Sequence, residues 1–382
     1  MRFVTARIVA AALGFRLISA LVAYIVNASV PMAQREQFTV YPSTHLFWDT
    51  FARWDSGWYF GIARHGYEFV EAGRSNLAFF PVYPMLMRYV ALAMGGGRVR
   101  IYMAGILISW TAFVLAMVML HRLARVELKD DGAARRAVLF AAIFPFAFFF
   151  GVVYSEALFL LFSVTAFYGF RAKRWWLGAT AGALATATRA NGVFIVPALA
   201  LIAWRETRGD RPAMLRAAAA LAATLLGVGT YSLFVYSISG HPFEWANSMD
   251  RWNWHPGAVA GWQPLVTVVT AMATRPYAFI TGSPQAVVDL LNASAGIAAL
   301  AATPFIWLRF GPAYPVLILI NLYVPLSTGA LEGIGRYCAV LFPFSLWLAT
   351  VRAPLARTAV TVVFGMFYVL CLALFTKVYP LF

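Results

Sequence analysis

The chain has 382 residues, of which 62% are apolar and only 12% are charged. Soluble domains carry about 25% charged residues, so this composition excludes an ordinary soluble enzyme and indicates a polytopic membrane protein. The formal net charge of +15 is typical of Lys and Arg residues that mark cytoplasmic loops. It therefore does not indicate nucleic-acid binding, although some of the excess suits anionic lipid headgroups or a phosphate-bearing substrate.

The N-terminal stretch resembles a signal peptide, because Arg2 and Arg7 precede an apolar run. That run continues to about Val26, and no small-residue cleavage site with a polar mature domain follows. We therefore expect a retained first membrane helix at 7–27, with the N-terminus in the cytoplasm. A first outer loop follows at 28–99, and we expect amphipathic helices within it.

The next part of the chain alternates apolar spans with basic turns. A span at 100–120 ends at "HRLARVELKDDGAARR", which we expect to be a cytoplasmic loop, and spans at 136–152 and 154–171 form a hairpin. Residues 175–204 are apolar but interrupted by "TRANG", and basic residues flank them on both sides. Two flanks on one side predict a broken or re-entrant hairpin, whose irregular backbone must be buried in protein or line a cavity.

The remainder predicts a span at 213–239, a second outer loop at 240–286, and four further spans at 287–309, 312–330, 334–350 and 355–378. The sequence thus predicts one all-α transmembrane domain over residues 1–382. It contains a bundle of about 10–11 transmembrane helices plus the broken hairpin. Cys338 and Cys371 both lie in apolar runs and indicate neither a disulfide framework nor a metal site.

The two outer loops concentrate aromatic and acidic residues. Seven of the 13 tryptophans lie there: Trp48, Trp54, Trp58, Trp245, Trp252, Trp254 and Trp262. Five acidic residues in 28–99 and two in 240–286 make seven of the 15 in the chain. An aromatic belt at the membrane interface explains part of this pattern. Rings beside carboxylates also suit a sugar site, where ring faces stack on the sugar and carboxylates bind its hydroxyl groups.

Asp55 stands out within "FARWDSGWYFGIARHGY". On a helical wheel over 47–65, Asp49 and Arg53 lie opposite an apolar stripe, and we expect Asp49 to be solvated. Asp55 instead lies within the stripe, which consists of Phe47, Phe51, Trp54, Trp58 and Ile62. Because an unpaired buried carboxylate costs several kcal/mol, two interpretations remain: a structural ion pair with an Arg of the bundle, or a base at a buried cavity near the membrane surface.

Five other ionisable residues fall among apolar ones, where charged groups are functional candidates: Glu156, Asp289, Glu332, Arg189 and Arg336. Glu332 and Arg336 have the i, i+4 spacing of a local pair. We expect Asp289 to snorkel or to cap its helix. Arg189, at the break of the hairpin, has the planar cation that clamps a phosphate.

The sequence does not indicate a nucleotide-binding site or a metal site. His65, His241 and His255 lack ligand spacing with Asp or Glu, and the sequence contains neither a P-loop nor a G-x-G-x-x-G motif. A group donor bound here would therefore be linked to a lipid and not to a nucleotide.

An ordered series of motifs adds a family resemblance. "RWDSGWYFGIARHGY" is followed by "AFFPVYP" at 78–84, "YSEALF" at 154–159, "TRANG" at 188–192 and "GIGRYCAVLFPF" at 333–344. This series resembles the PIG-V-type family, related to GPI mannosyltransferase II, within the GT-C class of integral-membrane glycosyltransferases. The resemblance covers most of the chain, and the WD segment with its F-P-x-Y-P is the most specific part.

The resemblance implies a GT-C-like bundle that transfers a sugar, usually mannose, from a polyprenyl or dolichyl phosphate with inversion. Asp55 matches the family's essential acid in the first outer loop, and Arg336 and Arg189 match positions that hold the donor phosphate. The remaining expected substrate-binding residues are Trp54, Trp58, Tyr59, His65, Tyr67, Glu156, Asn191, Glu332 and Tyr337. The compact, Ala- and Arg-rich chain departs from eukaryotic members, so a GPI precursor is not the expected acceptor.

We therefore hypothesise a bacterial plasma-membrane enzyme with Asp55 as general base and guanidinium groups stabilising the departing phosphate. Its site faces the extracytoplasmic side and needs neither metal nor cofactor. The expected partners are a polyprenyl-phosphate sugar, a glycan or lipid-glycan acceptor, and membrane lipids. The alternatives are a lipid or solute transporter or flippase, and a non-catalytic subunit of a glycan-assembly complex.

Overall fold

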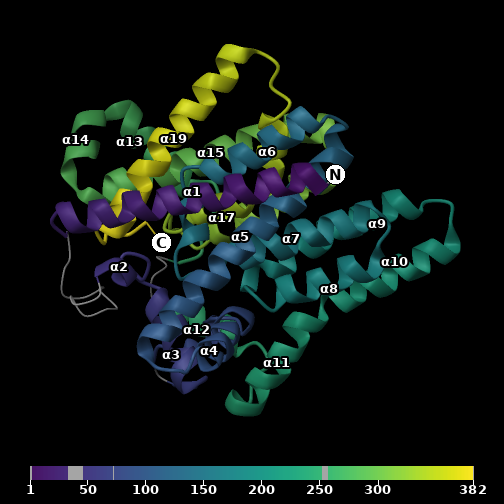
Figure 1. Ribbon diagram of the computed structural model, residues 1–382, viewed down its shortest axis with the longest axis horizontal. Helices are drawn as coiled ribbons and strands as arrows, with labels where there is room; N and C mark the ends of the chain where they lie inside the picture. Colours follow the sequence, from purple (N-terminus) through teal and green to yellow (C-terminus); the bar gives the residue numbers. More distant parts are fainter. Residues whose placement is uncertain (1, 33–45, 72, 252–256, 382) are drawn as a thin grey trace.

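A computed structural model describes residues 2–32, 46–71, 73–251 and 257–381 of the protein (Figure 1). These residues are predominantly helical, and no strand occurs among them. Five helical stretches in this part of the chain are long and apolar enough to cross a membrane. They are α1 (Arg2–Ser29), α5 (Arg98–Leu128), the consecutive α10 (Arg211–Thr224) and α11 (Leu226–Ser239), α15 (Pro284–Phe310) and α19 (Pro354–Thr376). They confirm five of the predicted spans and make the chain a multi-pass membrane protein.

The other predicted spans consist of shorter helices. The first two correspond to α6 (Asp131–Ile143) with η3 (Ala147–Gly151), and to α7 (Glu156–Arg171). The last two correspond to α16 (Ala313–Leu326), and to α17 (Ile334–Val340) followed by α18 (Phe342–Leu348). Proline, which lacks an N–H donor, explains two of the interruptions: Pro145 follows α6 and Pro343 opens α18.

The charged stretch after the second span is not a loop. Helix α5 continues to Leu128 and α6 begins at Asp131, so that two residues connect them. Asp130 caps α6 by accepting a hydrogen bond from the Gly132 N–H at 2.8 Å. The expectation of a loop was wrong, because most of these charged residues belong to the last turns of α5 and the first turns of α6, where the backbone is helical.

The broken hairpin at 175–204 is confirmed. Helices α8 (Trp175–Thr186) and α9 (Ile195–Thr207) are separated by an extended residue, Arg189, and by η4 (Ala190–Phe194). The start of α8 and the end of α9 lie close together, because Arg171, just before α8, forms an ion pair with Glu206 at the end of α9. A Cβ at Gly192 would lie 2.4 Å from the Ala185 carbonyl oxygen, so the tight approach at the break requires glycine.

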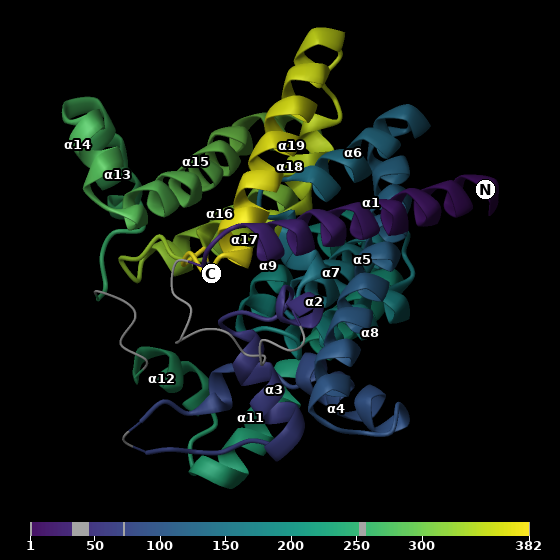
Figure 2. The same cartoon turned by 60° about the vertical axis from the view of Figure 1, so that its left-hand side comes forward.

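The first outer loop contains α2 (Leu46–Asp49), α3 (Ser56–His65), η2 (Asn76–Ala78) and α4 (Val82–Ala93), and the second contains α12 (Glu244–Arg251), α13 (Gln263–Thr274) and α14 (Pro276–Gly282). Helices α3, α4 and α12 lie at one end of the molecule (Figure 2). Helices α13 and α14 lie towards the opposite end, where they pack beside α15. The single helical wheel over 47–65 was wrong, because the chain turns between α2 and α3 and Trp54 adopts a positive φ of 51°.

Candidate active site

The carboxylate of Asp55 points into the bundle. Asp55 occupies the N-cap position of α3, where an Asp side chain ordinarily accepts a hydrogen bond from a backbone N–H of the first turn. It makes no such bond. Instead its Oδ2 accepts a hydrogen bond from Arg336 Nη1 at 2.6 Å, and its side chain is 6% exposed. The Asp55 side chain therefore does not cap α3, and its partner, Arg336, lies 281 positions away in the sequence.

The segment that carries Asp55 is tied to the "YSE" motif. The Val153 N–H donates to the Phe51 carbonyl at 2.9 Å, and the Ser56 hydroxyl donates to the Val153 carbonyl at 3.1 Å. The Asp55 N–H donates to the Tyr154 hydroxyl at 3.3 Å. Because residues 146–160 are all buried, this connection between α6 and α7 supports the Asp55 turn from inside the core.

Glu156 is shared by two arginines. It is the first residue of α7, a position where the helix dipole favours a carboxylate, and its side chain is 0% exposed. Its Oε1 pairs with Arg189 Nη1 and lies 3.8 Å from Arg336 Nε. Its Oε2 has no hydrogen-bond partner among the residues described. Glu156 therefore joins the Arg of the broken hairpin to the Arg that holds Asp55.

Arg189 extends this polar chain towards α16. Its Nε donates to Asn191 Oδ1 at 3.1 Å, and Asn191 Nδ2 donates to Asn321 Oδ1 at 3.0 Å. The Arg189 guanidinium also lies over the Tyr337 ring, 5.5 Å from its centroid. The irregular backbone of the break therefore places polar side chains inside the bundle, as expected where such backbone is buried in protein.

Arg336 is positioned by its neighbour Gly335. The Gly335 N–H donates to Asn292 Oδ1 at 2.7 Å, which fixes α17 against α15. A Cβ at Gly335 would lie 2.2 Å from the Phe146 ring, so only glycine allows this approach. The Arg336 guanidinium lies over the Tyr154 ring, 5.8 Å from its centroid, between Asp55 and Glu156.

We refer to Asp55, Glu156, Arg189 and Arg336 as the four-charge cluster. Its two carboxylates balance its two guanidinium groups, and Arg336 has the most exposed side chain of the four, at 17%. Guanidinium groups bind phosphate through directed N–H donors. A carboxylate released from such a pair can accept a proton. The cluster thus contains the functional groups for phosphate recognition and for general base catalysis.

The expectation for Asp49 was wrong, and the possible local pair of Glu332 with Arg336 does not form. Asp49 is not solvated but 3% exposed, and its Oδ2 accepts a hydrogen bond at 2.7 Å from the fully buried Arg53. The turn after α2 places both side chains beneath the end of α19, where Arg53 also donates to the Thr376 carbonyl. Arg336 pairs with Asp55 and Glu156 instead of Glu332, which forms no ion pair with any described residue.

The other predicted site residues separate into two groups. Glu156, Asn191 and Tyr337 contact the arginines of the cluster, and the Tyr59 hydroxyl is hydrogen-bonded to Ser155 at 2.8 Å, one residue before Glu156. Trp54 precedes Asp55 in the turn. Of the others, His65 is exposed, Glu332 is half-buried and interacts electrostatically with Arg336, and Tyr67 donates to the Phe79 carbonyl at 2.7 Å. The Trp58 ring stacks on Phe79 with centroids 5.9 Å apart.

Three residues around the site were not predicted: Tyr154, Asn321 and Asn292. The two asparagines carried a signal, because an amide within an apolar membrane helix usually has a partner in the bundle. Trp252, Trp254 and His255 lie outside the described residues. The described part of the chain contains no group of three or more His, Cys, Asp or Glu residues arranged to hold a metal ion.

The family follows from comparison with known proteins. A family model described as mannosyltransferase (PIG-V) matches residues 3–208, more than half of the chain. The chain belongs to the PIG-V mannosyltransferase family, a family of glycosyltransferases. The matched range includes Asp55, Glu156 and Arg189, whereas Arg336 lies beyond it.

Two curated relatives illustrate the extent of this similarity. GPI alpha-1,6-mannosyltransferase 2 of Cricetulus griseus is 33% identical over 156 residues, covering 38% of this chain and 30% of that protein. GPI mannosyltransferase pigv-1 of Caenorhabditis elegans is 27% identical over 163 residues, covering 37% and 24%. The aligned regions thus span less than a third of each relative's length.

A solved structure shows the same fold over nearly the whole chain. The crystal structure of the Archaeoglobus fulgidus oligosaccharyltransferase in its apo form superposes with a TM-score of 0.51 at 15% identity, covering 97% of this chain and 56% of that one. At this identity the likeness concerns the fold alone. It confirms the predicted all-α, GT-C-like membrane bundle.

Proposed function

We propose that this PIG-V family member is an inverting glycosyltransferase. It moves a sugar, mannose in the first instance, from a polyprenyl-phosphate donor to an acceptor hydroxyl, with Asp55 as general base. The observation that carries the proposal is that the Asp55 carboxylate, at a helix N-cap position, bonds to Arg336 instead of to its own helix. The family membership supports mannose as the sugar.

The reaction is a single displacement at the anomeric carbon. The acceptor oxygen forms a bond to that carbon while the bond from the carbon to the phosphate oxygen breaks. Asp55 takes the proton of the acceptor hydroxyl, and the electron pair of the broken bond leaves with the polyprenyl phosphate. Arg336 and Arg189 stabilise the charge on this leaving group. One displacement inverts the configuration of the sugar.

The pairing of Asp55 with Arg336 implies an order of binding. In this pair an Arg336 N–H donor occupies the Asp55 carboxylate. A donor phosphate that binds Arg336 competes with Asp55 for the same N–H groups. Donor binding therefore releases the base, and the acceptor is deprotonated only when a donor is in place.

The proposed setting is a bacterial plasma membrane, with the N-terminus in the cytoplasm and the four-charge cluster reached from the extracytoplasmic side. The acceptor is a glycan or lipid-glycan hydroxyl. The clustering of α3, α4 and α12 at one end of the molecule supports an acceptor site at that end.

The test is sugar transfer in proteoliposomes that contain the full chain and labelled polyprenyl-phosphomannose, with release of polyprenyl phosphate as the readout. Asp55→Asn should lower turnover about 10²- to 10⁴-fold, the usual contribution of a general base, while donor binding persists. Asp49→Asn is the matched control, because it makes the same change at a buried, Arg-paired Asp six residues earlier. Wild-type turnover by Asp55→Asn would exclude it as the base.

A lipid or solute transporter is the second candidate. The break between α8 and α9 with its buried Arg189 favours it, since transporters bind substrates at broken helices. Counterflow uptake in the same proteoliposomes, without any covalent product, would support transport over transfer.

A further inference from the structure

A buried arginine in the middle of α1 has unused hydrogen-bond donors. Arg16 is 1% exposed, and its Nη1 donates to the Ala147 carbonyl at 3.4 Å. Its Nε and Nη2 are buried and have no hydrogen-bond partner among the described residues. No carboxylate in the described part of the chain lies within 4.0 Å of its guanidinium. A buried charge without a counter-ion costs several kcal/mol, so this arginine requires a compensating group.

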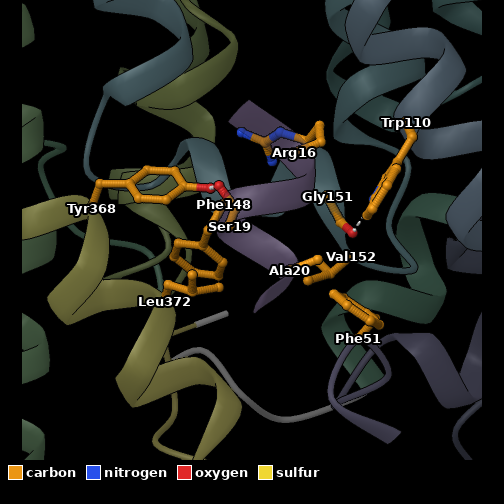
Figure 3. A pocket seen from close by; sticks show the side chains of 10 residues that line it. All are labelled: Arg16, Ser19, Ala20, Phe51, Trp110, Phe148, Gly151, Val152, Tyr368 and Leu372. Atoms are coloured by element: carbon orange, nitrogen blue, oxygen red, sulfur yellow. Dashed lines mark hydrogen bonds between the residues drawn. The ribbon is translucent and has the colours of Figure 1, made fainter. Parts of the chain in front are cut away.

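Arg16 lies at the edge of a small cavity between α1, α5, η3 and α19 (Figure 3). The other polar groups around the cavity already have partners. The Tyr368 hydroxyl donates to Ser19 Oγ at 3.0 Å, Ser19 donates to the Phe15 carbonyl at 2.8 Å, and Trp110 Nε1 donates to the Gly151 carbonyl at 3.1 Å. The buried donors that lack a hydrogen-bond partner at this cavity are those of Arg16. The Tyr368 hydroxyl interacts with the Arg16 guanidinium, but it is uncharged and does not neutralise it.

Aromatic rings provide partial compensation. The Arg16 Cζ lies 4.2 Å from the centroid of the Phe113 ring and 4.9 Å from that of Phe15. Cation–π contacts of this kind contribute up to about 2 kcal/mol. That is less than the cost of burying the charge, and a ring face does not replace the hydrogen bonds that Nε and Nη2 lack.

The size of the cavity limits the compensating group. Its volume is about 10 Å³, which is room for one particle of about the size of a water molecule. A phosphate or a sugar is too large. A water molecule could accept a hydrogen bond but would leave the charge uncompensated, whereas a monatomic anion satisfies both requirements.

We propose that Arg16 binds a single halide ion, chloride in the cell, within the membrane domain. The site adjoins the segment that supports Asp55, because Phe51 and Gly151 line the cavity and the Phe51 carbonyl accepts the Val153 N–H. The bound ion neutralises Arg16 and stabilises the packing of η3 against α1. The inference does not depend on the proposed sugar transfer.

The test is the melting temperature of the purified full chain in detergent, at constant ionic strength, as gluconate is replaced by chloride or bromide. The melting temperature should rise saturably with the halide, because a ligand that binds only the folded state stabilises it. Arg16→Met, which keeps an unbranched side chain but removes the charge, should lose this dependence. Arg7→Met is the matched control, since Arg7 is exposed on the same helix, and it should keep the dependence.

A second variant covers the case in which Arg16→Met does not fold. A Cβ at Gly151 would lie 2.6 Å from Arg16 Nη1, so Gly151→Ala displaces the guanidinium while keeping the charge, and it should also lose the halide response. A wild-type melting temperature that is equal in chloride and gluconate would mean that water alone occupies the cavity and would overturn the proposal. A halide response that persists in the Arg16 and Gly151 variants would overturn it too, because the ion would bind elsewhere.

Discussion

Individual residues of the four-charge cluster depend on one another. Glu156 is the central member, since its Oε1 is near both Arg189 and Arg336 while Arg336 also holds Asp55. Both interpretations that the sequence left open for Asp55 are therefore compatible: the ion pair with a bundle arginine exists, and it is the resting state of the proposed base.

Glu156→Gln should destabilise the protein by about 3–5 kcal/mol, because it leaves a buried guanidinium without its carboxylate. Combining it with Arg189→Met should recover part of this loss, since both charges of the pair are then removed. Chemical unfolding of the wild type, both single variants and the double variant in detergent measures the coupling. Glu68→Gln, at an exposed glutamate, is the control, and strictly additive effects would contradict the pairing.

Glu332 should make stability depend on pH. It lies in the turn before α17, outside the five long helices, where burial and the charge of Asp289 raise the pKa of its carboxyl above 4.5 while Arg336 opposes the shift. The folded protein thus holds the Glu332 proton more tightly than the unfolded chain does. The contribution of this protonated carboxyl to the free energy of unfolding is complete below about pH 4.5 and is lost as the pH rises through the folded-state pKa. Between about pH 4.5 and 7, the wild type should lose stability relative to Glu332→Gln. Parallel melting-temperature profiles of the two proteins would refute this.

Among the elements, the short helix α17 shows how packing places a functional side chain. Its seven residues are too few to be stable alone, and the Phe146 ring and the Asn292 side chain hold it at Gly335. The element that carries Arg336 is therefore positioned by η3 and α15, and not by its own helical propensity.

Gly335→Ala should displace α17 and with it Arg336, because the new methyl group would overlap the Phe146 ring. We expect overpacking to cost about 1–3 kcal/mol and to raise the KM for the donor. Gly365→Ala is the matched control, since a Cβ there meets no atom within 4 Å. Combining Gly335→Ala with Phe146→Leu should restore part of both properties, and no recovery would argue against this contact as the cause.

The whole molecule has two chemically distinct ends. Helix α5, with 31 residues, is about 46 Å long at 1.5 Å per residue, which exceeds the hydrocarbon core of a membrane. One of its ends meets α3 and α4, and the other meets the ion pairs of Arg171 with Glu127 and Glu206. This separation is the structural basis of the proposed topology.

Cysteine labelling in intact spheroplasts checks that topology. Lys129→Cys follows α5 and Glu71→Cys lies near α12, and both positions are exposed. A membrane-impermeant maleimide should label Glu71→Cys from outside and Lys129→Cys only after lysis. The native Cys338 and Cys371 are buried and provide an unlabelled background. Labelling of both variants from the same side would contradict the orientation.

Features that depend on local composition could be predicted from the amino-acid sequence. Runs of about 20 apolar residues predict membrane helices whatever their neighbours, and the five long helices confirm these spans. The basic flanks of 175–204 likewise predicted a hairpin that begins and ends on one side. Motif order was enough to indicate the PIG-V family, because the motifs record residue types and not their contacts.

Which charged side chains pair depends on tertiary packing and could not be predicted from the sequence. Arg336 has Glu332 one turn away in sequence, yet it pairs with Asp55, because the Phe146 and Asn292 contacts at Gly335 orient α17 towards the Asp55 turn. The burial of Asp49 and the unpaired Arg16 depend equally on packing between α1 and α19. Helical periodicity describes one helix at a time, whereas the energy of a buried charge depends on every element around it.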